Sequence, residues 1–232
     1  SFPAGSVANA DGTLYNGKVL ISARFLNPNH ADMGDMMPGG LMADGANGNT
    51  YILGTLGMLA IELHDENGKT LNILKGKQAT IEMPAVTGYK ASTVPFWYFD
   101  EHKGRWQEEG IATLQGDKYV ATVSHFSFWN LDVPYPLVQL CGEVLYENGN
   151  PAQNVNLKIE VDGLGCRYGY INESGQFCGK VPKGKTLKIS IHSNICNKVL
   201  AEVTINPLHD DTQMNKIIVE KLNEYTITGT LT

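Results

Sequence analysis

The segment VPFWYFDEHKGRWQEEG, residues 94–110, combines aromatic, acidic and basic side chains in one short stretch. Aromatic rings that reach solvent can stack on sugar faces, and neighbouring carboxylates can accept hydrogen bonds from sugar hydroxyls. On this interpretation the ligand-binding candidates are Trp97, Tyr98, Asp100 and Trp106. The alternative is a hairpin of two strands joined by EHKG, whose large rings lie in the protein core.

In the hairpin interpretation, the strand alternation sends Trp97 and Phe99 to one face and Phe96 and Tyr98 to the other. Gly104 stands where a hairpin loop favours a positive φ. One face would enter the core, and the second would lie under a neighbouring loop or face solvent. The sequence leaves these two possibilities open.

The same segment offers carboxylates for acid/base chemistry, namely Asp100 with Glu101 and Glu108 with Glu109. A glycosidase needs two carboxyl groups roughly 5–9 Å apart, on opposite sides of the bond that breaks. Adjacent strand residues point to opposite faces, and turn carboxylates are solvated. The chain also has no Gly-x-Ser-x-Gly elbow, phosphate-binding loop, dinucleotide glycine motif or His-Glu-x-x-His. We therefore predict no catalytic residues, no cofactor and no enzymatic activity.

Other polar clusters give weaker signals for a metal site. HADMGDMM contains His30, Asp32 and Asp35, but their spacing matches no defined calcium loop. His125, in SHFSFWN, alternates away from its aromatic neighbours and is interpreted as a hydrogen-bonded structural histidine. His209 belongs to a polar loop. No metal ligand is predicted.

The elements that must position these residues are strands. Apolar or alternating runs such as KVLISARFL (18–26), MLAIELHD (58–65) and TLKISIHS (186–193) are separated by Asn-Gly and Lys-Gly turns. No sustained 3.6-residue apolar period occurs, so no long helix is expected. The predicted fold is all-β, with two tandem β-sandwich domains.

The two prolines of VPYP, residues 133–136, mark the boundary between these domains. We predict a first domain over residues 1–135 and a second over 136–224, with seven short strands at roughly ten-residue spacing. The last residues, YTITGTLT (225–232), align with VQLCGEVL (138–145). They are expected to be the final strand of the second domain or the start of a further repeat that is cut off.

All four cysteines, Cys141, Cys166, Cys178 and Cys196, lie in the second half. An even number within one segment suggests one or two disulfides and an oxidising compartment, and the alternative is four buried free thiols. Four cysteines allow three full pairings, so the connectivity stays open. The long gaps between them, with no Cys-x-x-Cys, disfavour zinc.

Composition excludes two further classes of function. Of 232 residues, 42% are hydrophobic and 18% charged, which is enough for a core, and the net charge of −6 offers no basic stripe for nucleic acid. No run of 18 apolar residues is present, so no membrane span is predicted.

The second half resembles the carboxypeptidase regulatory-like domain over about residues 136–224. The resemblance is carried by LCGEVLYENGNPAQNVNLKI, GYINESGQFCGKVPKG and TLKISI. It implies a seven-stranded sandwich of transthyretin type, similar to the immunoglobulin sandwich.

The first half resembles a module of cartilage intermediate layer protein and of surface proteins from gut-dwelling Gram-negative bacteria. The matching blocks are MMPGGL, LGTLGMLAIELHDENGKTLNI, PFWYFDEHKGRWQEEG and VSHFSFWNLDVP. The resemblance implies an extracellular or cell-surface protein without catalysis.

From these observations we expect a fragment of a secreted or surface protein, bacterial and anchored to the outer membrane in its full length, that acts in adhesion, ligand binding or structural spacing. The alternative is a carbohydrate-binding module of a polysaccharide-handling surface system. The expected partner is a surface glycan or another surface protein, and the sequence gives no oligomeric state.

Overall fold

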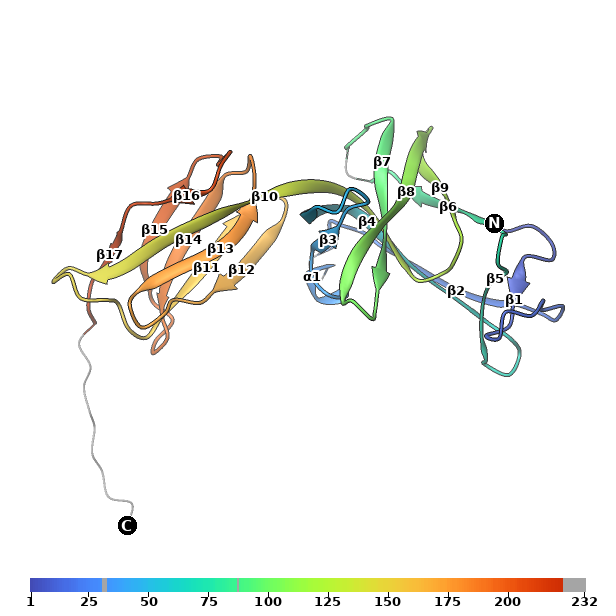
Figure 1. Ribbon diagram of the computed structural model, residues 1–232, viewed down its shortest axis with the longest axis horizontal. Coiled ribbons are helices and arrows are strands. Elements are labelled where there is room, and N and C mark those ends of the chain that lie inside the picture. The colour runs from blue at the N-terminus through green and yellow to red at the C-terminus, as the bar shows by residue number, and fades with distance from the viewer. Residues whose placement is uncertain (31–32, 87, 223–232) are drawn as a thin grey trace, which may run out of the picture. The chain divides into compact units, whose positions relative to one another are not determined.

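The computed structural model describes residues 1–30, 33–86 and 88–222. The chain folds into two compact units, Ser1–Pro136 and Leu137–Thr232 (Figure 1). The boundary predicted between residues 135 and 136 lies one residue before this division. Residues 225–232, expected to be a final strand or a new repeat, lie outside the described residues.

The all-β prediction is confirmed. The described residues contain a single helix, the one-turn α1 (Met33–Met36), and all other regular elements are strands. The first unit contains β1 (Val7–Ala8), β2 (Leu20–Leu26), β3 (Met42–Asp44), β4 (Thr50–His64), β5 (Thr70–Ile73), β6 (Ala79–Pro84), β7 (Thr93–Asp100), β8 (Arg105–Gln115), β9 (Lys118–Val123) and the first part of β10 (Phe128–Tyr146).

The sheet of the first unit curls until part of it closes. Its strands are hydrogen-bonded in the order β1-β5-β4-β10-β7-β8-β9-β6, and β2 pairs with β4. The short strand β3 pairs antiparallel with β4 and parallel with β8, so β3, β4, β10, β7 and β8 form a closed ring (Figure 1). Ala43 stands at the closing point, with Tyr51 as its partner on β4 and Trp106 as its partner on β8.

Two of the apolar cores of the first unit lie on opposite faces of β7. The ring core, which fills the closed ring beside α1, is formed by Leu26, Met33, Met37, Ala43, Leu53, Met58, Trp97, Phe99 and Trp106. The second core contains Phe96 and Trp129, whose rings stack with centroids 4.8 Å apart, together with residues of β4, β6, β8 and β9. Because both faces of β7 are covered, its residues 96–99 are all aromatic instead of alternating between apolar and polar residues.

The predicted hairpin turns are present in the first unit. Asp65 directly follows β4 and accepts backbone N–H bonds from Asn67 and Lys69, both at 2.8 Å. Gly68 takes the positive φ of 80° that this turn requires. The side chain of Asp65 thus organises the link between β4 and β5, as expected for an acidic residue before Asn-Gly.

The second unit is a sandwich of two sheets. It contains the remainder of β10 with β11 (Val155–Val161), β12 (Gly165–Gly169), β13 (Gln176–Pro182), β14 (Leu187–Ser193), β15 (Val199–Ile205), β16 (Thr212–Gln213) and β17 (Ile217–Val219). One sheet has the order β12-β11-β14-β15. In the other, β10 pairs with β13, and β16 and β17 pair in parallel with successive parts of β10.

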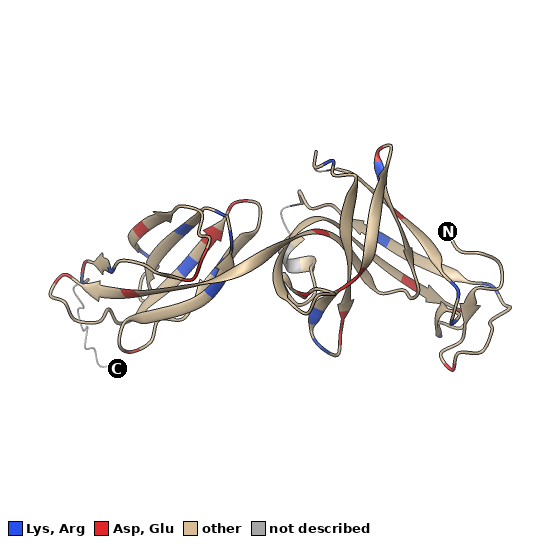
Figure 2. Ribbon diagram, turned by 45° about the horizontal axis from the view of Figure 1, so that its top comes forward, with Lys and Arg blue, Asp and Glu red and all other residues tan. Residues whose placement is uncertain are grey.

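Because β16 and β17 follow the same edge of β10, they act as one interrupted strand. With that pair counted once and β10–β15 added, the residues of the second unit up to 222 contain seven strands, the number predicted. Inward-facing residues of both sheets form its core, among them Leu140, Val144, Phe177, Ile189 and Ile217. Acidic and basic side chains are interspersed along the strands of each unit (Figure 2). None of the described helices is long and apolar enough to span a membrane.

Candidate functional site

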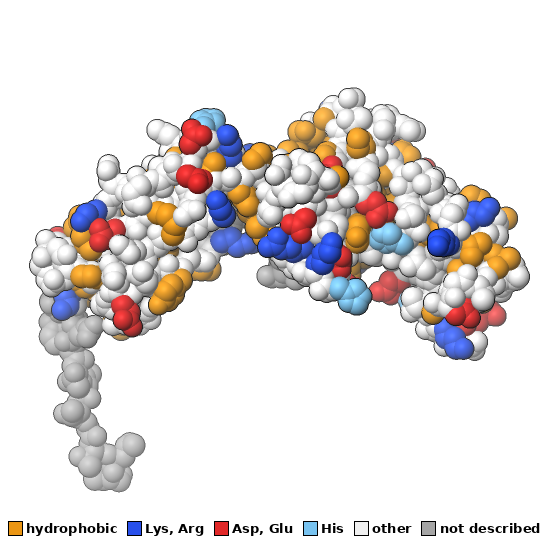
Figure 3. All heavy atoms as spheres, in the orientation of Figure 1, with side chains coloured by type: hydrophobic (Ala, Val, Ile, Leu, Met, Phe, Trp, Pro, Cys, Tyr) orange, Lys and Arg blue, Asp and Glu red, His pale blue; other side chains and the backbone are white. Residues whose placement is uncertain are grey.

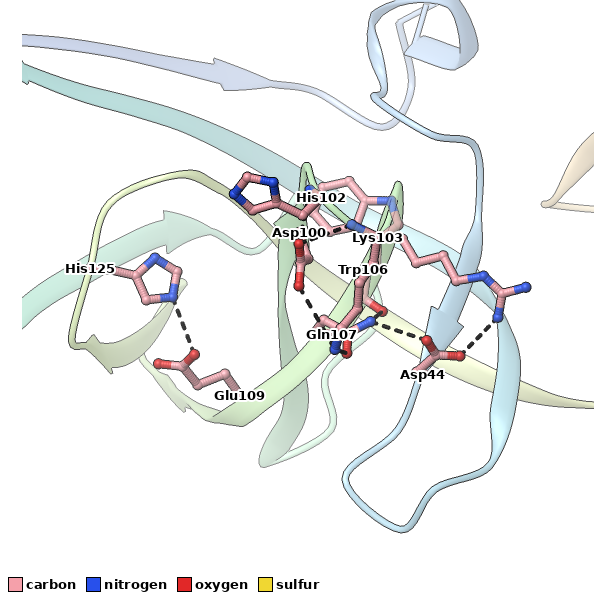
Figure 4. Close-up of polar contacts among 9 residues, drawn as sticks. Asp44, Asp100, His102, Lys103, Trp106, Gln107, Glu109 and His125 are labelled. Carbon is pink, nitrogen blue, oxygen red and sulfur yellow. Dashed lines mark hydrogen bonds and ion pairs between the residues drawn. The ribbon is translucent and has the colours of Figure 1, made fainter. Parts of the chain in front are cut away.

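The segment 94–110 forms the hairpin of β7 and β8. Phe99 pairs with Trp106 and Asp100 with Arg105, and the Gly104 N–H donates to the Asp100 carbonyl at 2.8 Å. Gly104 has a φ of 63°, as predicted. The Asp100 carboxylate accepts the backbone N–H groups of His102 (3.0 Å) and Lys103 (3.1 Å). Asp100 therefore stabilises the turn instead of facing an open site (Figure 4).

The two tryptophans of the hairpin are fully buried, each with 0% of its surface exposed. Trp106 donates its indole N–H to the Gly40 carbonyl at 2.9 Å, and Trp97 donates to the Asp132 carbonyl at 3.4 Å. The Trp106 ring also meets Phe99 edge-on, with centroids 5.3 Å apart. The stacking role considered for Trp97 and Trp106 would need an exposed ring face, and neither residue has one.

Tyr98 lies on the opposite face of β7 and is half-buried. Its ring packs edge-on against His125 at 4.7 Å and lies 5.9 Å from Trp129. Burial raises the pKa of the Tyr98 hydroxyl, with a further contribution from the negative charges of Asp100 and Glu109. Tyr98 and Phe96 thus share one face and Trp97 and Phe99 the other, which confirms the predicted alternation.

A polar network joins the hairpin to β3. Asp44 accepts hydrogen bonds from Arg105 Nη1 (3.0 Å) and Gln107 Nε2 (3.2 Å), and Lys103 Nζ donates to Gln107 at 2.8 Å (Figure 4). Thr50 Oγ also donates to Asp44, at 3.3 Å. Burial alone would raise the pKa of Asp44, but the bonds from Gln107 and Arg105 outweigh it and lower that pKa. The network fastens the two strands that close the ring.

A second carboxylate, Glu109, binds two neighbours. Ser124 Oγ donates to one of its oxygens at 3.0 Å. His125 Nε2 lies 3.2 Å from the other oxygen (Figure 4). The serine hydroxyl donates to the carboxylate instead of to the imidazole. The trio therefore lacks the hydroxyl–imidazole–carboxylate order that activates a serine nucleophile. His125 is the hydrogen-bonded structural histidine that the sequence suggested.

The carboxylates proposed as an acid/base pair have structural partners. Asp100 holds the turn, Glu109 holds Ser124 and His125, and Glu108 accepts the backbone N–H of Ala46 at 2.9 Å. Glu101 is exposed and lines a hollow of about 220 Å³ with His64, Asn72 and Phe126. No two of these carboxyl groups face each other across that hollow, so the hairpin does not present the arrangement that glycoside hydrolysis requires.

The described residues do not form a cluster of metal ligands either. Within residues 1–30, 33–86 and 88–222, no group of three or more His, Cys, Asp or Glu side chains is arranged to hold a metal ion. Of the HADMGDMM residues, Asp32 and the side chain of Asp35 lie outside the described part of the chain.

One disulfide is present, between Cys141 on β10 and Cys178 on β13, which are direct cross-strand partners. The alternative of four free thiols is therefore wrong. Cys166, half-buried, and Cys196, exposed, are free. Cys196 has a lowered pKa because its thiolate accepts hydrogen bonds from the Lys198 backbone and the Ser193 side chain.

Sequence reasoning missed a buried polar cluster formed by Thr55, Asn130 and Asp132. Both Asn130 and Asp132 are 0% exposed, and the Thr55 hydroxyl donates to Asn130 Oδ1 at 2.9 Å. Burial raises the pKa of Asp132 well above its usual range, and the nearby Thr55 hydroxyl opposes that shift only in part. The available signal was the segment FWNLDV, in which two polar residues alternate with apolar ones.

The fold and these contacts define a class of protein: an all-β chain of two units whose most chemically suggestive residues support its own structure. No family model matches the chain. Over 113 residues it is 31% identical to human cartilage intermediate layer protein 1, a weak homology that covers 47% of this chain and 9% of that protein. The chain thus spans less than a tenth of this relative. The resemblance of residues 136–224 to the carboxypeptidase regulatory-like domain stays a prediction.

Three solved structures show distant similarity. The streptococcal ancillary pilin has 9% identity and a TM-score of 0.27, covering 62% of this chain and 69% of the pilin. The Bacillus anthracis TIE protein has 11% identity and a TM-score of 0.26, covering 77% of this chain and 49% of that one. The C-terminal fragment of the pilus adhesin SpaC from Lactobacillus rhamnosus GG has 11% identity and a TM-score of 0.25, covering 78% of this chain and 72% of the fragment. At this level the similarities carry no argument about function.

Proposed function

We propose that this chain is a non-catalytic segment of a secreted or cell-surface protein, and that it acts in adhesion, ligand binding or structural spacing. The observation that carries the proposal is the use of the 94–110 hairpin. Its tryptophans fill the ring core, and Asp100, Glu108 and Glu109 hold backbone or neighbouring side chains. The residues of this hairpin that could have bound a ligand or taken part in catalysis instead stabilise the fold.

Two further observations support an extracellular setting. The Cys141–Cys178 disulfide is of a kind that persists in oxidising compartments. The human relative is named for a layer of cartilage. Acidic and basic side chains are interspersed on the visible surface of each unit (Figure 3). A surface of this kind favours solubility.

Carbohydrate binding is a second candidate function, but at a different place from the hairpin. Tyr168 on β12 and Tyr170 just after it are 73% and 78% exposed. Tyr170 borders a groove of the second unit with Glu143, Asn172 and Gln176. An exposed ring beside amide and carboxylate groups is the combination that a sugar-binding surface needs.

The first experiment is a binding screen of the purified chain against a broad glycan panel, with analysis of the glycans after incubation. Binding that is lost in Tyr170→Ala but kept in Tyr89→Ala, a variant of an exposed tyrosine in the first unit, would support the carbohydrate candidate. If the chain binds no glycan, the carbohydrate candidate fails, and a surface protein partner should be sought by pull-down from intact cells. Release of shortened glycan products by the wild type, abolished by Glu101→Gln, would overturn the non-catalytic proposal.

A further inference from the structure

The ring core of the first unit contains one polar cluster among apolar side chains. Strand alternation along β10 sends Trp129 and Leu131 to the second core, so Asn130 and Asp132 point the other way, toward Leu53, Met58 and Trp97. Asp132 is the direct partner of Thr55 on β4, beside a bulge in the β4–β10 ladder. Three polar side chains from two strands therefore meet inside the ring.

The hydrogen bonds of this cluster are incomplete. Thr55 Oγ donates to Asn130 Oδ1 at 2.9 Å and accepts the Gly57 N–H at 3.2 Å. Asn130 Nδ2 and both Asp132 carboxyl oxygens are buried with no hydrogen-bond partner among the described residues. A buried polar group left in this state costs about 1–3 kcal/mol. A well-packed core that retains three such atoms calls for an explanation.

The arrangement has the parts of an acyl transfer. The Thr55 hydroxyl is already in contact with the Asn130 carboxamide, which is the proximity that lets a weak nucleophile react. Among the described residues the carboxamide nitrogen has no hydrogen-bond partner, so its departure would break no hydrogen bond to them. Burial raises the pKa of the neighbouring Asp132 carboxyl and so favours its neutral form, in which it can both accept and donate a proton.

We propose that Thr55 and Asn130 become joined by an ester bond between Thr55 Oγ and Asn130 Cγ, with Asp132 transferring the protons. For the reaction the Thr55 hydroxyl turns from Asn130 Oδ1 to the Asp132 carboxyl. Thr55 Oγ then attacks Asn130 Cγ while the hydroxyl proton passes to the carbonyl oxygen of that carboxyl. The Asp132 O–H gives its proton to the departing nitrogen, the Cγ–Nδ2 bond breaks, and ammonia leaves. The Asp132 carboxyl carries one proton at the end of the step, as it did at the start, and no oxidant, metal or water is consumed.

The bond would tie β4 to β10 covalently inside the ring. β10 is the strand that continues from the first unit into the second, over Phe128–Tyr146. It would add a covalent link to the hydrogen-bonded ladders that β10 forms with β4 and β7. This inference stands on the buried cluster alone and does not depend on the proposed surface role.

Intact mass spectrometry of the full reduced chain tests the proposal. The wild type is expected to weigh less than its sequence mass by one ammonia molecule. Proteolysis should release one joined species containing the peptides of Thr55 and Asn130, and hydroxylamine, which cleaves esters, should separate them. Thr55→Val, close in shape, is expected at its full sequence mass, while Thr55→Ser keeps the hydroxyl and the loss. Thr113→Val, on the exposed face of β8, is the matched control and keeps the loss.

Localisation by peptide mapping is essential, because an Asn-Gly pair such as Asn67-Gly68 can lose ammonia by closing on its own backbone. A wild-type chain at full sequence mass overturns the proposal, and so does a mass loss that persists in Thr55→Val. If Thr55→Val does not fold, the joined peptide in the wild type and its retention in Thr55→Ser still decide the question. Asp132→Asn, which keeps the shape but removes the acid, is expected to carry little or none of the bond.

Discussion

Arg105 Nη1 lies 3.0 Å from the Asp44 carboxylate, and this ion pair joins β8 to β3 at the point where the ring closes. The two residues are 61 positions apart in sequence, and only the curl of the sheet brings them together. Gln107 and Thr50 donate to the same carboxylate. The side chain of Asp44 therefore links its own strand, β3, to both β8 and β4. The closure thus combines a short stretch of backbone pairing with a side-chain network.

Removing this network should weaken the first unit modestly. We expect Asp44→Ala to lower the free energy of unfolding by about 1 kcal/mol or less, because the pair is partly solvated. The pKa of Asp44 is lowered in the folded state, so its contribution is present above the unfolded pKa and is lost as pH falls through the folded value. Urea unfolding of both proteins at neutral and acid pH measures the difference.

The control for that experiment is Glu82→Ala, which removes the Lys118–Glu82 pair of 3.0 Å on exposed edge strand β6. A smaller effect than that of Asp44→Ala is expected. An Asp44→Ala difference that grew on acidification would contradict the prediction.

Truncating the buried tryptophans should be severe. Trp97→Ala and Trp106→Ala are each expected to destabilise the first unit by about 3–5 kcal/mol, because each leaves a large cavity in the ring core. Tyr168→Ala, at an exposed ring, should change stability by less than about 0.5 kcal/mol. Denaturant unfolding followed by near-ultraviolet circular dichroism gives both values. Equal effects for the buried and exposed positions would show that the hairpin rings are not core.

The buried Asp132 should impose an unusual pH dependence. Its folded pKa lies well above the ordinary 3.8, so between those two values the folded protein binds one proton more than the unfolded chain. Its contribution to stability is full below about pH 3.8 and falls by up to about 1.4 kcal/mol per pH unit as pH rises toward the folded pKa.

Asp132→Asn removes this titration while keeping the side-chain shape. The free energy of unfolding of the wild type minus that of Asp132→Asn should therefore decline from acid toward neutral pH, and subtraction cancels the other titrating groups. Two parallel stability curves over that range would mean that Asp132 ionises as readily in the folded protein as in the unfolded chain.

The Cys141–Cys178 disulfide should stabilise the second unit. The cysteines are 37 residues apart, and a closed loop of that size is worth about 3–4 kcal/mol in the loop-entropy account. Cys141→Ala/Cys178→Ala is expected to lose that amount in urea unfolding, and Cys166→Ser/Cys196→Ser should lose little. In denaturant without reductant, thiol titration should detect the two free cysteines, Cys166 and Cys196. Four reactive thiols would contradict the assignment.

Much of the local structure could be predicted because it is encoded in short patterns. The alternation of Phe96, Trp97, Tyr98 and Phe99 correctly assigned the two faces of β7. Asn-Gly and Lys-Gly pairs marked turns whose glycines do take positive φ. What alternation could not decide was whether both faces were covered, because that depends on strands far away in sequence.

The remaining features depend on contacts that no local pattern encodes. The three residues of β3 close the ring through partners on β4 and β8, and so short a strand has little signature of its own. The pairing of Cys141 with Cys178 follows from the β10–β13 register. Asn130 and Asp132 look like ordinary polar strand residues until the ring interior is found on their side of β10.

The ring has a consequence for how copies of this chain behave when crowded together. Strands at an open sheet edge can recruit strands from other molecules and start ordered aggregates. On β3, between Met42 and Asp44, β4 pairs along one edge and β8 along the other. A strand from another molecule therefore has no free edge of β3 to pair with. Any polymerisation of misassembled copies should begin instead at edges such as β6 or β12, which end their sheets.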